Sequence, residues 1–131
     1  MLVAPVIPGL TDHEMPAILD AAVKAGARYA GWVMLRLPFA VKDLFADWLT
    51  AHVPERKQRV LGRIRAVRNG ELSDTRFGTR MRGEGPLAET IRAMFQVGCR
   101  RAGILGRGPK LSTAAFRRPG EQRGLFDSLP E

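Results

Sequence analysis

The alternation of apolar and polar residues predicts two strands near the start of the chain and helices after them. Residues 2–7 and 29–37 are nearly continuous apolar runs, which are typical of parallel strands buried on both faces. Between them, five apolar residues recur at helical spacing: Met15, Ile18, Leu19, Ala22 and Val23. Strand, helix and strand in this order predict a βαβ unit with a right-handed crossover, and therefore an α/β fold.

Turn and cap residues mark the ends of the first predicted helix. Pro8-Gly9 closes the first strand, and Thr11 and Glu14 have the spacing of a capping box, in which each side chain binds a backbone N–H. Gly26 is a typical residue at a helix end. The pattern therefore predicts a helix that begins near Thr11 and ends near Gly26.

Three more apolar stripes predict three more helices, separated by prolines and glycines. Pro54 breaks the first stripe, Asn69-Gly70 ends the second, and Pro86 stands where a first helical turn tolerates proline. The stripes are Val41, Leu44, Phe45, Trp48, Leu49 and His52; then Val60, Leu61, Ile64 and Val67; then Leu87, Ile91, Met94, Phe95, Gly98 and Ala102. The other faces of the middle helix carry six basic residues: Arg56, Lys57, Arg59, Arg63, Arg65 and Arg68.

The remaining segments lack periodicity. Residues 70–85 read as a long irregular loop, which is usually functional or disordered at this length. We interpret residues 1–105 as one α/β portion and residues 106–131 as a basic, Gly/Pro-containing flexible tail. Because the first strand begins at Met1, its neighbours are expected in another part of a larger domain, of which this chain is the later part.

Composition narrows the range of functions. The 131 residues carry a formal charge of +8, which favours a polyanionic partner, and 45% are hydrophobic, which argues against general disorder. Cys99 is the single cysteine, so the chain has no internal disulfide and no Cys-only metal site, and we expect a cytoplasmic location. No metal site is predicted from His13 or His52, and no apolar run reaches the roughly 18 residues of a membrane span.

The first candidate site is the carboxyl edge of the two strands, where α/β folds bind ligands. Ile7, Pro8, Gly9 and Thr11 form the turn there, and N–H groups at a helix start suit an anion. An ordinary βα turn is the alternative. Arg36 ends the second strand at the same edge and suits a carboxylate or phosphate, unless it pairs with a helix residue.

The second candidate site is the loop RFGTRMRGEG, residues 76–85, called the arginine loop below. Its arginines suit phosphates and its aromatic ring suits a base: Arg76, Phe77, Arg80 and Arg82. The alternative is a solvated basic loop in which Glu84 holds an arginine internally. Cys99 falls on the apolar stripe with Ile91 and Phe95, so we expect a buried, inert thiol.

A third candidate lies in the tail. Gln122, Leu125 and Phe126 resemble the short peptide that bacterial replication proteins insert into the sliding clamp, with a glutamine and two apolar anchors. The alternative is a tail that folds back on its own domain.

Four segments together resemble the C-terminal half of a radical SAM protein of the uncharacterised group similar to spore photoproduct lyase. They are APVIPGLTDHE, WVMLRLP, RFGTRMRGEGP and QRGLF, and the first and third are the most specific. The resemblance implies a partial (β/α) barrel. It also implies a [4Fe–4S] cluster, held by a Cys-x-x-x-Cys-x-x-Cys motif, that binds S-adenosylmethionine and cleaves it reductively to a carbon radical.

The resemblance also implies roles for the candidate residues. The strand end at Ile7, Pro8 and Gly9 would lie near S-adenosylmethionine, Arg36 would lie at the barrel mouth, and the arginine loop would lie near substrate or a domain contact. Relatives of the lyase type act on damaged DNA.

The chain departs from this family at the cluster motif, because Cys99 is its only cysteine. We therefore expect a fragment that is inactive alone and needs the missing N-terminal half or a separate cluster-bearing chain. The alternative function is a small basic module, without catalysis, that binds nucleic acid or serves as a scaffold.

Overall fold

Strands and helices alternate in the first part of the chain, as the computed structural model shows for residues 1–104, 106, 108, 110, 112–114 and 116. The elements in order are β1 (Leu2–Val6), α1 (Met15–Lys24), β2 (Gly31–Met34), α2 (Val41–His52), α3 (Lys57–Ala66) and α4 (Pro86–Arg101). Short 3-10 turns at Asp12–Glu14 and Pro54–Arg56 precede α1 and α3. The second predicted strand is therefore shorter than residues 29–37.

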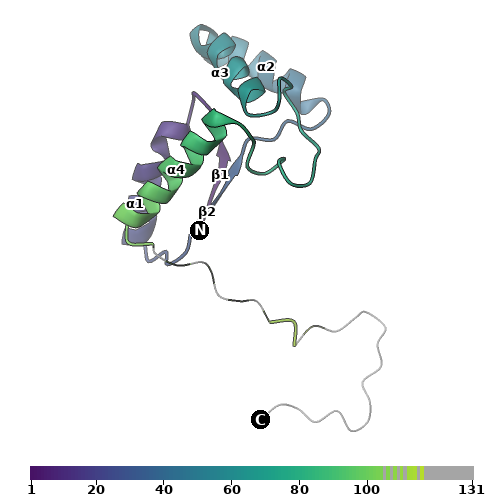
Figure 1. Ribbon diagram of the computed structural model, residues 1–131. Helices are drawn as coiled ribbons and strands as arrows, with labels where there is room; N and C mark the ends of the chain where they lie inside the picture. The colour runs from purple at the N-terminus through teal and green to yellow at the C-terminus, as the bar shows by residue number, and fades with distance from the viewer. Residues whose placement is uncertain (105, 107, 109, 111, 115, 117–131) are drawn as a thin grey trace, which may run out of the picture.

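β1 and β2 pair in parallel across α1, which confirms the predicted βαβ order (Figure 1). Leu2 is opposite Gly31, Val3 is opposite Trp32, and the register is irregular between Val3 and Val6. Pro5 lies in that interval and has no N–H to donate to a ladder. The chain thus combines helices with a parallel pair of strands.

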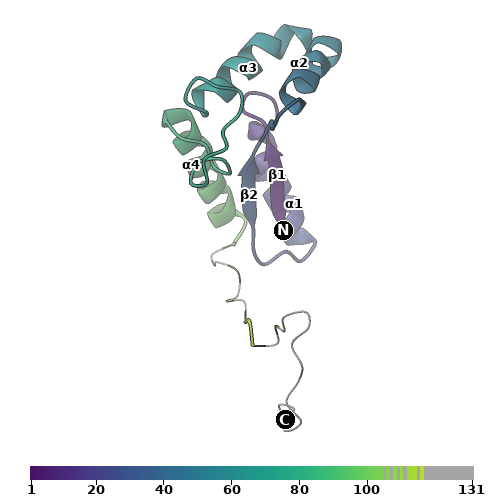
Figure 2. The same ribbon diagram turned by 90° about the vertical axis from the view of Figure 1, so that its right-hand side faces the viewer.

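One face of this pair forms the main core with α1 and α4, which lie on the same side of the strands in Figure 1; in Figure 2, the two helices lie to the left and right of the strands. The buried strand residues are Val3, Val6, Trp32 and Met34, and they meet Met15, Leu19, Ala88 and Ile91 of the helices. Gly98 lets α4 approach α1, because a Cβ there would lie 2.8 Å from Leu19 Cδ1. These contacts fix the strands beneath the helix pair.

Within the described residues, the two strands are covered on one face only. Leu2 is 62% exposed, Ala4 is exposed, and Val33 is only partly buried. These residues alternate with the buried ones and so point to the face opposite α1 and α4. We call this set, Leu2, Ala4 and Val33, the open sheet face.

The α2–α3 pair lies beyond the carboxyl ends of the strands and has its own core (Figure 1). This second cluster is made of Leu37, Leu49, Val60, Leu61 and Ile64. Of the apolar stripe predicted on α2, only Leu49 is buried, while Leu44 is 67% exposed. The ring of His52 lies 5.1 Å from that of Trp48, on a part of α2 that is also exposed.

Candidate functional site: the carboxyl edge of the strands and the arginine loop

The backbone amides in the turn after β1 form hydrogen bonds within the turn itself. The amides of Leu10, Thr11 and Asp12 all donate to the carbonyl oxygen of Ile7, at 3.1, 3.0 and 3.3 Å. The hydroxyl of Thr11 accepts the amide of Ile7 at 3.0 Å. The predicted capping box does not form, because the strand end takes the Thr11 hydroxyl and α1 begins only at Met15. An anion would therefore find these three amides occupied.

Basic side chains from α3 and the turn before it surround the outer side of this turn. A cavity of about 380 Å³ is lined by Gly9, Asp12, His13, Arg56, Arg59 and Arg63, and we call it the basic hollow. Arg63 crosses Gly9 so closely that a Cβ there would lie 2.7 Å from Arg63 Cδ, and Arg63 Nη1 is 3.7 Å from Asp12 Oδ2. Pro8, which is part of this turn, is buried.

Arg36 follows β2 at the same edge and is exposed, as predicted. Its Nη1 lies 3.9 Å from the sulfur of Met81, which belongs to the arginine loop. In the alternative interpretation, Arg36 pairs with a residue on a helix. Within residues 1–104, Arg36 makes no such ion pair. Its charge is therefore available to a ligand at this edge.

Arg68 differs from the other basic residues of this region, because it is buried, with only 2% of its surface exposed. One end of its guanidinium donates to the carbonyl of Leu35 at 2.7 Å, and the other donates to the carbonyl of Thr79 at 3.2 Å. Burial lowers the pKa of Arg68; Asp74 partly offsets this, and Arg36 adds to the lowering. Arg68 thus joins the end of β2 to the arginine loop.

Arg76 is held within the loop and is not a free phosphate ligand. Its Nε and Nη2 donate to Asp74 at 3.1 and 3.0 Å, and Nη2 also pairs with Glu84. These donors, with the Thr79 hydroxyl at 2.5 Å, hold the pKa of Asp74 well below its usual range. The alternative in which Glu84 holds an arginine is confirmed.

The other three predicted loop residues do not form one surface. Phe77 is 84% exposed, and the guanidinium carbon of Arg80 lies 4.7 Å from its ring centroid. Arg82 turns the other way, toward α4, with its guanidinium carbon 4.7 Å from the Trp32 ring centroid. Phe77 with Arg80 remains a candidate stacking site, whereas Arg82 belongs to a different cavity.

Replacing Asp74 with Asn should make stability less dependent on pH in acid. The folded-state pKa of Asp74 is lowered, so its contribution is full above the unfolded value of about 3.9 and is lost as pH falls below that. We expect the urea midpoints of wild type and Asp74→Asn to differ by a constant amount from pH 8 to 5 and to converge below about pH 4. Asp20→Asn, at an exposed position on α1, is the control; equal convergence in both variants would contradict the assignment.

The remaining predictions concern the tail, the thiol and metal binding. Gln122, Leu125 and Phe126 lie outside the described residues. Cys99 is buried, as predicted, and burial raises the pKa of its thiol. Within the described residues, no three His, Cys, Asp or Glu side chains gather as metal ligands, and no helix has the length and apolarity to cross a membrane.

The comparison of this chain with known proteins found no relative. No protein-family model, curated protein or solved structure matches the chain. The radical SAM resemblance therefore stays a prediction.

Proposed function

We propose that this chain supplies the C-terminal part of a radical SAM enzyme and works only together with a cluster-bearing half or chain. The observation that carries the proposal is the open sheet face. A parallel sheet needs cover on both faces, yet Leu2 and Ala4 are exposed and α1 and α4 lie on the other side. Further strands of a partial barrel would cover this face.

The positions of the candidate residues support the same proposal. The Pro8-Gly9 turn and Arg36 both follow strands at the carboxyl edge, which is where α/β enzymes bind their ligands. In the assembled enzyme, S-adenosylmethionine would lie at this edge and would supply the carbon radical. Arg36 would offer a fixed positive charge to a carboxylate or phosphate there.

The residues of this chain do not fit the iron–sulfur cluster. A [4Fe–4S] cluster needs several thiolates, and the chain has one cysteine, which is buried on α4 with a raised thiol pKa. We therefore assign the cluster to the partner and derive no step of the reaction from this chain.

A charged residue on the open sheet face tests the proposal. Leu2→Asp should leave the chain folded, because Leu2 is 62% exposed, but should prevent recovery of a cluster-bearing partner from the native cell. Ala21→Asp, exposed on α1, is the matched control and should retain the partner. Equal recovery with both variants would show that the open sheet face is not the contact.

A second candidate function, binding of nucleic acid, is favoured by the basic hollow. Three arginines line it with one aspartate, and Arg59 has no ion pair within residues 1–104. Phosphates are the groups that such a surface attracts.

The salt dependence of oligonucleotide binding tests this second function. For a labelled single strand, log Kobs should fall with log salt with a slope of about −2, as expected for three phosphate contacts. Arg59→Gln should make the slope shallower by about 0.7, and Arg101→Gln on α4 should not change it. Binding that does not depend on salt would exclude the basic hollow as a nucleic-acid site.

A further inference from the structure

We propose that the cavity between β2 and α4 binds a small organic anion with an apolar, ring-sized body and one carboxylate or phosphate head. The cavity has a volume of about 690 Å³, within the range of about 300–1,000 Å³ for small-molecule sites. Its lining comes from β2, from α4 and residues next to them, and from Arg82 of the arginine loop, and it shares no lining residue with the basic hollow.

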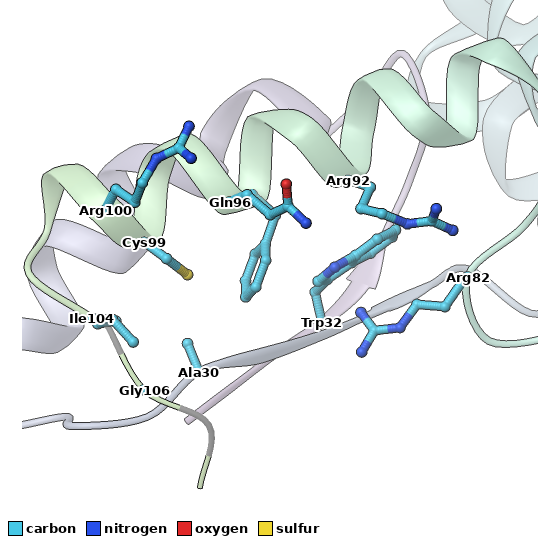
Figure 3. A pocket seen from close by; sticks show the side chains of 10 residues that line it. Ala30, Trp32, Arg82, Arg92, Gln96, Cys99, Arg100, Ile104 and Gly106 are labelled. Carbon is cyan, nitrogen blue, oxygen red and sulfur yellow. The ribbon is translucent and has the colours of Figure 1, made fainter.

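One end of the cavity is lined by apolar side chains and, beside them, by Arg100 of α4. Figure 3 shows Ala30, Cys99 and Ile104 at this end, with Trp32 in the middle. The rings of Trp32 and Phe95 form a tilted pair, with centroids 6.1 Å apart, and so present aromatic surface to a ligand. Because burial raises the pKa of Cys99, its thiol stays neutral and does not repel an anion.

The other end is cationic, and none of the described residues that line it is acidic. Arg82 and Arg92 meet at this end, one from the arginine loop and one from α4 (Figure 3). No lining residue is an Asp or Glu, and neither arginine makes an ion pair in the part of the chain that the structure describes. Burial and the charge of Arg92 both lower the pKa of Arg82, so two like charges are held together without compensation.

These two ends together define the ligand chemistry. An anionic head would neutralise the arginine pair through charge-assisted hydrogen bonds. An apolar body would displace water from Phe95, Cys99 and Ile104, which inorganic phosphate cannot do. The carboxylate and phosphate forms of such a molecule share this chemistry, and the arginine pair accepts either.

The two tryptophans provide an internal control for a binding test by NMR. Trp32 lines the cavity, whereas Trp48 lies on α2, and Trp48→Phe identifies which indole N–H signal is which. On titration of the full chain with 2-naphthoate or naphthyl phosphate, the Trp32 signal should shift and saturate while the Trp48 signal stays in place. The neutral isostere 2-naphthalenemethanol should bind at least about tenfold more weakly.

Substitution of one arginine of the pair, Arg92, separates charge from general apolar binding. Arg92→Met should weaken 2-naphthoate binding about tenfold and leave naphthalenemethanol unchanged, and Arg101→Met at the end of the same helix should change neither. The proposal is overturned if the acid and the alcohol bind equally, if both indole signals move together, or if inorganic phosphate alone gives the same saturable shift.

Discussion

Arg68→Met should lower the free energy of unfolding by about 2–4 kcal/mol. The substitution keeps most of the apolar volume but leaves the partly buried carbonyls of Leu35 and Thr79 without their charged donor, at about 1–2 kcal/mol for each. The loss should appear as a lower urea midpoint. It should also release the arginine loop, so trypsin should cut after Arg76, Arg80 or Arg82 earlier than in wild type.

A matched substitution on the same helix isolates the effect of burial. Arg65 is exposed near the end of α3, and Arg65→Met should cost less than about 1 kcal/mol. Arg68→Lys keeps the charge but lacks the fork that reaches two carbonyls, so we expect an intermediate loss. If Arg68→Met were as stable as Arg65→Met, the connection between β2 and the loop would not contribute to stability.

Gly83→Ala should cost about 2–4 kcal/mol of unfolding free energy. Gly83 is buried with a φ of +71°, a conformation that costs a side-chain-bearing residue about 1–2 kcal/mol. In addition, the new Cβ would lie 3.0 Å from the carbonyl oxygen of Val67 and 3.2 Å from its Cβ, where the backbone cannot yield cheaply. The measurement is again the urea midpoint at neutral pH.

Gly70→Ala separates the two contributions to this loss. Gly70 has a φ of +90°, but a Cβ there would meet nothing within 4 Å. Only the conformational cost of about 1–2 kcal/mol should therefore appear. A Gly83→Ala loss equal to that of Gly70→Ala would mean that the loop moves freely away from Val67.

The helices were predictable because apolar spacing and breaking residues agree there. The stripe from Val41 to His52 ends at Pro54 and matches α2, and Pro86 begins α4 as its position suggests. The parallel order of β1 and β2 also followed from two apolar runs around one helix. In these segments, local preference and the tertiary fold point to the same structure.

The candidate sites were harder to predict because their contacts join distant segments. Thr11 was interpreted as a helix cap, but the nearby end of β1 uses its hydroxyl. The pattern assigned Arg68 to the basic faces of its helix, although it follows Ile64 by one helical turn on the buried stripe, which was the available signal. The cavity with Arg82 and Arg92 depends on how α4 crosses β2, and no spacing in the sequence reports that crossing.

Isolation of the native protein tests the central claim most directly. With an affinity tag at the C-terminus of the native gene product, and with purification under anaerobic conditions, we expect an assembly heavier than the 14.5 kDa of this chain. Iron and acid-labile sulfide should be present in the amounts of a [4Fe–4S] cluster, and Leu2→Asp should remove them. Recovery of the 14.5 kDa chain alone, free of iron and sulfide, would contradict the proposal and leave binding of nucleic acid at the basic hollow as the function to pursue.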